Sequence, residues 1–358
     1  MKPPTLYDHQ EEVLKRSWNR KYFALLLEQG CGKTRILLDT ARWLWQERKI
    51  RAMVVIAPNG VHRNWTEIEI PIHAPKILPE NILTWDSRKS KAEDFAANPG
   101  KTGLLVRAYN VEGFSRDGAP ASLALRKFLK KFPDTLLIID ESTRIKTPTA
   151  KRTRVLISLG RLAQYRRIAT GMLVAQTPFD VYSQFQFLEK GCLGFPTFSD
   201  FKYTYGTFKN DHVTTKKGKM VEFKKLRDYK CLDDLRKRIA PLSSRYTKEQ
   251  CLDLPPKIRT SVIVTLDPKQ RRFFNDMEAE GVIYVPEENI DLMAPVHLVR
   301  LIRCQQITSG FIPTENPEGT PWTPIAGIKN PKLQAIGIFW RTMQGRSLFG
   351  RFFDQKSK

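Results

Sequence analysis

The stretch EQGCGKT, residues Glu28–Thr34, constrains the fold of this chain more than any other feature. It follows the apolar run Tyr22–Leu27 and precedes Arg35–Leu44, where apolar residues recur at helical spacing. A strand, a glycine-containing turn and a helix therefore follow one another in the order that a phosphate-binding loop requires. Gly30 and Gly32 allow backbone N–H groups to converge on an anion, and the start of the helix adds its positive dipole end.

The residues after the second glycine complete the expected nucleotide site. Lys33 is expected to reach the outer phosphates of ATP, and the Thr34 hydroxyl is expected to bind Mg²⁺. The strict G-x-x-x-x-G-K-[ST] pattern is not met, because Leu27 occupies the position of its first glycine. The alternative is a glycine-rich turn that precedes Lys-Thr by chance. The residues that we expect to contact the nucleotide are Gln10, Gln29, Gly30, Cys31, Gly32, Lys33, Thr34 and Arg35.

Gln10 belongs to this set because of its side chain and its position. The segment Leu6–Gln10 opens a helix just upstream of the phosphate loop. A side-chain amide offers a donor and an acceptor to the edge of adenine. The alternative is a solvated glutamine at the start of a helix.

A pair of carboxylates follows the buried strand predicted at Thr135–Ile139. The strand delivers Asp140 and Glu141 to the same sheet edge as the phosphate loop. Asp140 is expected to bind Mg²⁺, and Glu141 to orient or deprotonate the attacking water. We therefore predict that Lys33, Asp140 and Glu141 are catalytic. The alternative is a solvated turn at a strand end.

The apolar run Ala52–Pro58 predicts a further strand that is buried on both faces of a parallel sheet. Asn59, Arg63 and Asn64 lie beyond its carboxyl end, where open α/β sheets bind ligands. We predict that they contact a nucleic-acid backbone. A capped helix with a buried Trp65 explains the same residues equally well.

Three more strands are expected near 82–85, 104–109 and 165–169. The last of them ends in Thr170 and Gly171, which are expected to sense the γ-phosphate and couple it to neighbouring loops. A simple turn at the strand end is the alternative.

Charge points to a polyanionic partner. The 358 residues include 60 Lys and Arg against 37 Asp and Glu, a net charge of +23. Phosphates favour such a surface through counterion release, and an anionic membrane surface is the competing explanation. No apolar stretch is long enough to span a membrane, and Met1–Pro4 does not begin a signal peptide. We expect a cytoplasmic protein without a membrane partner. The five cysteines are scattered, so no disulfide or zinc site is expected.

The segment Lys202–Arg238 holds twelve basic and five acidic residues with interleaved aromatic residues. This composition suits contact with a nucleic-acid backbone, and an ordinary soluble insertion is the alternative. Leucines and an isoleucine at near-helical intervals predict helices, with a flexible lysine-rich loop at 211–220. The lysines that we expect to contact nucleic acid are Lys146, Lys216, Lys217 and Lys219.

The C-terminal part predicts a strand at Ser261–Val264, three helices and a loop at Phe311–Gly327. The helices are expected at Lys269–Glu280, Val296–Thr308 and Lys332–Met343, and a short strand at Arg346–Phe349. We expect an ATP-binding lobe over 1–190, a basic helical insertion over 191–257, a C-terminal completion of the lobe with linker helices over 258–343, and the start of a second lobe over 344–358.

Several motifs together resemble one family in order and over nearly the whole chain. The chain is similar to the N-terminal motor lobe of superfamily 2 helicase-like ATPases, closest to the Swi/Snf-type DNA translocases and their phage relatives. The motifs are LYDHQ at 6–10, EQGCGKT at 28–34, VVIAPNGVHRNW at 54–65, IIDESTRIKTP at 138–148, ATGMLVAQTPFDVYSQFQFL at 169–188, RYTKEQCLDLPPK at 245–257 and LIRCQQITSGF at 301–311.

This resemblance implies a fold and an activity. The fold is a three-layer α/β RecA-like P-loop lobe with a mostly parallel sheet, a basic helical insertion and a C-terminal helical segment. The activity is ATP- and Mg²⁺-dependent movement along double-stranded DNA, with a second RecA-like lobe as partner. Gln10 matches the adenine-reading glutamine, Lys33 and Thr34 the phosphate and magnesium ligands, and Asp140 with Glu141 the acidic box.

Two departures from the family pattern bear on turnover. Relatives carry Thr-Gly-Thr-Pro where this chain has Thr170-Gly171-Met172-Leu173. The chain also stops at Lys358, before the second lobe and its arginine finger, which is worth ~10³–10⁵ in rate. We expect weak ATP binding and slow hydrolysis by this chain alone. The alternatives are a DNA-binding or regulatory protein without turnover and, less favoured, a P-loop kinase.

Overall fold

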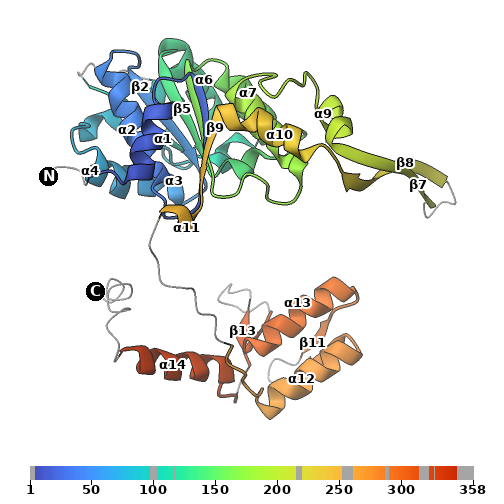
Figure 1. Cartoon of the computed structure of the whole chain (residues 1–358). Coiled ribbons are helices and arrows are strands. Elements are labelled where there is room, and N and C mark those ends of the chain that lie inside the picture. The colour runs from blue at the N-terminus through green and yellow to red at the C-terminus, as the bar shows by residue number, and fades with distance from the viewer. Residues whose placement is uncertain are drawn as a thin grey trace. The chain divides into compact units, whose positions relative to one another are not determined.

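The structure of the chain is a computed structural model that describes residues 5–96, 103–115, 118–214, 220–251, 261–286, 290–313, 322–325 and 327–344. It forms two compact units, Met1–Leu254 and Pro255–Lys358 (Figure 1). The candidate site lies in the first unit.

A seven-stranded sheet organises the first unit, in the order β3-β4-β2-β5-β6-β1-β9. Every neighbouring pair is parallel, which confirms the α/β prediction. All of these strands therefore end at one common edge, which we call the carboxyl edge. The strands are β1 (Tyr22–Leu27), β2 (Ala52–Ala57), β3 (Ile82–Thr84), β4 (Leu105–Asn110), β5 (Thr135–Asp140), β6 (Tyr165–Ala169) and β9 (Ser243–Tyr246).

Two hydrophobic cores lie on opposite faces of this sheet. Successive residues of one strand alternate between them, so that Leu26 packs in one core while Leu25 and Leu27 pack in the other. This alternation is the two-residue period of a strand that is covered on both faces. Helices from 120–188 cover the first face, and helices from 8–46 cover the second (Figure 1). The predicted three-layer lobe is thus confirmed.

The helices of this unit are short to medium in length. Their bounds are α1 (Asp8–Ser17), α2 (Lys33–Gln46), α3 (Val61–Asn64), α4 (Ile70–His73), α5 (Ala92–Ala96), α6 (Pro120–Lys131), α7 (Lys151–Gly160), α8 (Val181–Leu188), α9 (Phe198–Tyr205), α10 (Leu232–Ile239) and α11 (Lys248–Cys251). A π-helical turn, η1 (Trp65–Glu69), joins α3 to α4, and short 3₁₀ turns include η3 (Val111–Phe114), η4 (Ser142–Ile145) and η5 (Pro178–Asp180).

The expected arrangement of the basic insertion, helices around a lysine-rich loop at 211–220, is wrong for residues 206–229. Between α9 and α10 the chain forms an antiparallel hairpin, β7 (Gly206–Thr214) and β8 (Met220–Tyr229), which extends away from the sheet (Figure 1). Aromatic and β-branched residues favour strands here, and Phe208 contacts Tyr203 and Phe179 at the hairpin base. Lys216, Lys217 and Lys219, in the expected loop, lie outside the described residues.

Strand β9 is a feature that the sequence interpretation missed. It follows α10 and pairs in parallel with β1, at the edge of the sheet. Its four residues Ser243–Tyr246 carry too short a pattern to distinguish a strand from a loop. The chain therefore returns to the phosphate loop after the hairpin, and α11 follows directly.

The second unit combines helices with two short hairpins. Its elements are α12 (Pro268–Ala279), β10 (Val282–Val285), β11 (Ile290–Met293), α13 (His297–Thr308), β12 (Phe311–Ile312), β13 (Thr323–Pro324) and α14 (Pro331–Gln344). The three predicted helices are confirmed, but the strand predicted at Ser261–Val264 is wrong. These residues are irregular, Ile263 is 96% exposed, and none of the described strands pairs with them. The strand predicted at 346–349 lies outside the described residues.

Candidate nucleotide-binding site

The turn between β1 and α2 depends on two glycines. Gly30 and Gly32 have φ angles of +88° and +80°, in the left-handed region that is costly for other residues. A side chain at position 32 would also overlap with a neighbour, since a Cβ there would clash with Nε2 of Gln10. The loop therefore has the strand–glycine turn–helix geometry of a phosphate cradle.

Helix α1 packs against this loop through two neighbouring side chains. Nε2 of His9 lies 3.0 Å from the carbonyl oxygen of Cys31. The Gln10 side chain is only 6% exposed, and its Oε1 accepts a hydrogen bond from the Tyr7 N–H over 3.1 Å. Gln10 thus lies beside the phosphate loop with its amide oxygen used by the backbone. Its contact with adenine stays a prediction.

The side chains that start α2 take different positions. The Lys33 ammonium donates to the carbonyl oxygens of Leu27 (3.0 Å) and Glu28 (3.4 Å), so it is held over the loop. Thr34 is half-buried in the first helical turn. Arg35 is buried, and its Nε donates to Asp39 over 2.6 Å. Its guanidinium is used inside the fold, which leaves its backbone as the part suited to a phosphate.

The acidic pair lies at the same carboxyl edge as the phosphate loop. Asp140 ends β5, and β6 alone separates β5 from β1. Oδ2 of Asp140 accepts from the indole N–H of Trp65 over 2.9 Å, and Oδ1 accepts from the Glu141 N–H over 3.0 Å. Burial raises the pKa of Asp140, while these two hydrogen bonds and the charge of Lys33 act in the opposite direction. Lys33 is thus close enough to act on the carboxylate.

Glu141 has an unusual backbone conformation. Its φ angle is +50°, a left-handed value that is rare for a residue with a side chain and clusters at functional sites. Burial and the charge of Asp140 raise its pKa, against the effects of Lys33, Thr170 and Arg144. A carboxylate with a raised pKa, near a phosphate loop, suits a proton acceptor.

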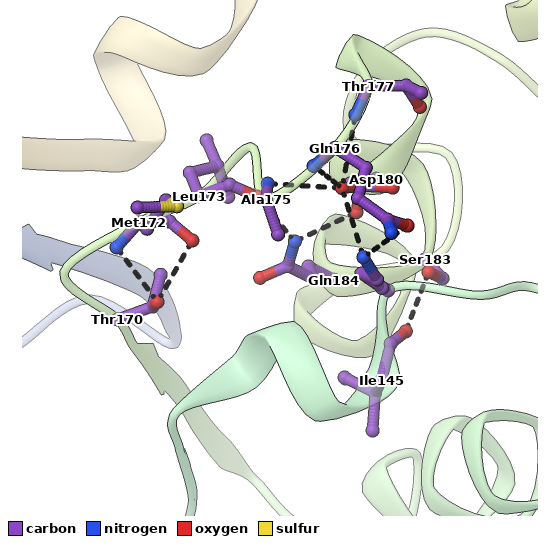
Figure 2. A network of polar contacts seen from close by, with 11 residues as sticks. Ile145, Thr170, Met172, Leu173, Ala175, Gln176, Thr177, Asp180, Ser183 and Gln184 are labelled. Carbon is purple, nitrogen blue, oxygen red and sulfur yellow. Dashed lines mark hydrogen bonds and ion pairs between the residues drawn. The ribbon is translucent and has the colours of Figure 1, made fainter. Parts of the chain in front are cut away.

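The end of β6 approaches both groups. The Thr170 hydroxyl donates to the Met172 carbonyl oxygen and accepts from the Met172 N–H, both at 3.1 Å (Figure 2), and Thr170 is among the groups that lower the pKa of Glu141. A Cβ on Gly171 would lie 3.4 Å from the backbone nitrogen of Gln29. Thr170 therefore acts on the acidic pair, and Gly171 lies against the phosphate loop. Their coupling role stays a prediction.

The residues predicted to contact nucleic acid have mixed surroundings. Asn59 and Asn64 are exposed, and Arg63 forms an ion pair with Asp86 at 3.0 Å. The Lys146 ammonium donates to Gln176 over 2.8 Å and lies 3.7 Å from Asp180. Trp65 is buried directly after the short helix α3, as in the alternative interpretation, but the start of α3 has no side-chain cap.

Two basic cavities share Arg144 in their linings, and one of them also contains Glu141. The first, of about 420 Å³, includes Glu141, Arg144 and Lys146 in its lining. The second, of about 360 Å³, is lined by Ser115, Arg144, Ala150, Lys151 and Arg152. Within the described ranges, Arg144, Lys151 and Arg152 form no ion pair, and Nε of Arg152 is buried without a partner. We call the second cavity the basic pocket.

The donor set fits Mg²⁺ together with a nucleotide. No group of three His, Cys, Asp or Glu side chains suited to a metal occurs in the parts of the chain that the structure describes. Magnesium commonly uses one or two protein oxygens and completes its shell with water and substrate phosphates. The Thr34 hydroxyl and the Asp140 carboxylate match this pattern. None of the described helices is long and apolar enough to cross a membrane.

Residues 9–306 match the family described as SNF2-related domain. The chain belongs to this family. Among SWI2/SNF2 structures, the ATPase core from Sulfolobus solfataricus in complex with dsDNA superimposes with a TM-score of 0.51 at 22% identity. The match covers 96% of this chain and 65% of the Sulfolobus chain, and it shows a shared fold.

Two curated proteins show how this SNF2-related chain compares in sequence. The Zorya protein ZorD of Escherichia coli O139:H28 (strain E24377A / ETEC) is 25% identical over 291 residues, which are 75% of this chain and 25% of ZorD. A putative SWI/SNF-related regulator of chromatin from Arabidopsis thaliana is 31% identical over 169 residues, which are 46% of this chain and 17% of that protein. The chain spans a quarter or less of the length of these relatives.

Several residues of this SNF2-related site were not predicted. Trp65 contacts Asp140, and the backbone N–H of Lys248 in α11 donates to Glu28 over 3.0 Å. Ser142 and Gln184 form a buried hydrogen bond beside Glu141. The sequence indicated Trp65 only as a core residue. The other two contacts join residues that lie 42 and 220 positions apart in the sequence. No local pattern indicates such contacts.

Proposed function

We propose that this chain is the ATP-binding motor lobe of a DNA-dependent ATPase. The observation that carries the proposal is the meeting of the phosphate loop and the acidic pair at the carboxyl edge. Lys33 is close enough to lower the pKa of both Asp140 and Glu141. Phosphate-binding and carboxylate groups at one site are the parts that nucleotide hydrolysis requires.

The residues divide the chemistry between them. Lys33 and the loop N–H groups stabilise the phosphates, and Gln10 lies where it can meet the base. Thr34 and Asp140 would hold Mg²⁺, which when bound supplies positive charge to the transferring phosphate. Glu141 orients the attacking water and accepts its proton, for which its raised pKa is suited.

Double-stranded DNA is the proposed partner. The net charge of +23 favours a polyanion, and the basic pocket provides guanidinium and ammonium groups that form no ion pair with any described residue. The Sulfolobus relative was solved in complex with dsDNA. We extend the proposal to a second RecA-like lobe, which would close on the nucleotide and supply an arginine to the transferring phosphate.

ATP turnover tests the proposal. Free phosphate release is measured for this chain with a second lobe supplied in trans or by a longer reading frame, with and without duplex DNA. Duplex DNA is expected to raise turnover, and Glu141→Gln to abolish it. The absence of stimulation with both lobes present rejects the motor proposal.

A DNA-binding protein without turnover is the second candidate, because Met172 and Leu173 replace the Thr-Pro of the coupling motif. Lys33→Ala distinguishes the two functions. It leaves DNA retention intact in both cases, and it removes a measurable ATPase activity only in the first. A phosphorylated small molecule in place of free phosphate would indicate the less favoured kinase.

A further inference from the structure

The side chain of Gln184 lies at the centre of a buried polar network behind the acidic pair. It is 0% exposed, although it belongs to α8, whose other buried residues are largely apolar. Its Oε1 accepts from the Ser142 hydroxyl over 2.6 Å. Its Nε2 donates to the carbonyl oxygens of Leu173 (2.9 Å) and Asp180 (2.8 Å). Figure 2 shows Gln184 together with these two residues. Both donors and the acceptor of the amide are thus used.

Two of the hydrogen-bond partners of Gln184 belong to different loops: Ser142 to the loop that contains Glu141, and Leu173 to the turn that follows β6. Ser142 follows Glu141 directly and begins η4. Leu173 ends the turn that starts at Thr170, a residue that lowers the pKa of Glu141 and whose hydroxyl bonds to Met172. One amide therefore connects the loop of the expected proton acceptor with the turn that contacts the phosphate loop.

The rest of the turn is held from the same side. Oδ2 of Asp180 accepts three backbone N–H groups, from Ala175 (3.1 Å), Gln176 (2.8 Å) and Thr177 (3.3 Å). The Ser183 hydroxyl donates to the carbonyl oxygen of Ile145 over 2.7 Å (Figure 2). The start of α8 thus fixes both loops, and Gln184 is the residue that bonds to each of them through its side chain.

The network includes Leu173, one of the two positions, with Met172, where the sequence departs from the Thr-Gly-Thr-Pro pattern of the family. A proline restricts φ and so stiffens the turn that contains it, whereas leucine does not. In this chain the Leu173 carbonyl is fixed by Gln184 instead. A buried amide of this kind is costly unless every hydrogen bond is made, so the network tolerates little displacement of either loop.

We propose that Gln184 is a positioning residue for hydrolysis. Its amide holds the Glu141 loop and the Thr170–Leu173 turn in fixed register, so that the proton acceptor and the coupling turn face the same γ-phosphate. The inference rests on the proposed ATPase function. It places the effect of Gln184 on the chemical step and not on nucleotide affinity.

The test compares Gln184→Met with Gln186→Met, both on α8. Gln186 is a matched control, because its amide bonds to the Phe195 carbonyl and the Gly191 N–H, away from both loops. With a second lobe and duplex DNA present, Gln184→Met is expected to lower kcat by about tenfold to a hundredfold with less than about threefold change in KM for ATP. Gln186→Met is expected to keep kcat. Equal kcat values for the two variants overturn the proposal.

Amide hydrogen exchange tests the same contacts without turnover. In Gln184→Met, segments 141–146 and 170–177 are expected to exchange at least about tenfold faster together, and in Gln186→Met they keep the wild-type rates. Unchanged exchange in Gln184→Met overturns the inference. If exchange is accelerated in Gln184→Met but the wild-type protein shows no ATPase activity, the proposed function is rejected. The connection of the two loops by Gln184 is then still supported.

Discussion

The indole N–H of Trp65 donates a 2.9 Å hydrogen bond to Oδ2 of Asp140. Trp65 begins η1, which follows β2 and α3, whereas Asp140 ends β5, so the bond joins a helical turn to the end of a strand at the carboxyl edge. The indole is 1% exposed and the carboxylate 8%. A carboxylate buried to this degree requires such a donor to remain oriented and ionised.

Replacing Trp65 by Phe removes this donor while it keeps an aromatic ring. We expect the free energy of unfolding to fall by about 1.5–3 kcal/mol, the usual range for a hydrogen bond to a charged group. The pKa of Asp140 should rise further, because the Trp65 bond lowers it. Urea denaturation checks the first effect, with Trp45→Phe, at a 41% exposed position, as the control. Equal stability of the two variants would contradict this account of the pair.

Gly32→Ala and Gly191→Ala separate backbone strain from steric overlap. Both glycines have a positive φ, +80° and +76°, but a Cβ at Gly191 meets nothing within 4 Å. Gly191→Ala is therefore expected to cost about 1–3 kcal/mol from its positive φ alone. Gly32→Ala should cost more and weaken ATP binding, because its Cβ displaces Gln10. Denaturation midpoints and binding of a fluorescent ATP analogue measure these effects, and equal costs would show that Gln10 does not constrain the loop.

Glu141→Gln should stabilise the ligand-free protein at neutral pH while it removes hydrolysis. The pKa of Glu141 is raised above 4.5, so ionising it costs more in the folded than in the unfolded state. This cost is absent below pH about 4.5, grows as the pH rises through the folded pKa and is then constant. The stability difference between variant and wild type should follow this course in urea titrations at several pH values. A gain that is equally large at pH 4 would show that ionisation is not its cause.

Lys151→Ala/Arg152→Ala tests the basic pocket as a phosphate site. The double variant should weaken duplex binding and reduce the slope of log K against log salt by about 1–2, since each lost phosphate contact removes about 0.9. Mg·ATP binding should not change. Lys130→Ala/Lys131→Ala is the control of equal charge, because these residues end α6 just before β5 begins, at the opposite edge of the sheet. If both double variants show the same slope, the pocket makes no specific contribution.

The central sheet and its site were predictable because their signals are local. Continuous apolar runs mark parallel strands, and glycines or carboxylates directly after them mark the carboxyl edge. The Tyr22–Leu27 and Thr135–Ile139 runs were assigned in this way, and the order of the strands then brings their ends together.

Other features depend on contacts that no local pattern encodes. The hairpin β7–β8 has a basic, aromatic sequence in which leucine spacing suggested helices, and strand pairing prevailed over that spacing. Gln184 occupies one position in an apolar helix, and its partners lie 11 and 42 residues away in the sequence. Its role in the network follows only from the packing of α8 against η4 and the turn after β6.

The most direct test of the shared magnesium–nucleotide site is a double-mutant cycle between Lys33 and Asp140. Calorimetric titration with a non-hydrolysable ATP analogue and Mg²⁺ would compare wild type, Lys33→Ala, Asp140→Ala and the double variant. We predict that each single change weakens binding at least about tenfold, and that the double variant departs from additivity by about 0.5–3 kcal/mol, as residues at one site do. Strictly additive losses, or wild-type affinity in Asp140→Ala, would contradict a common site for the two residues.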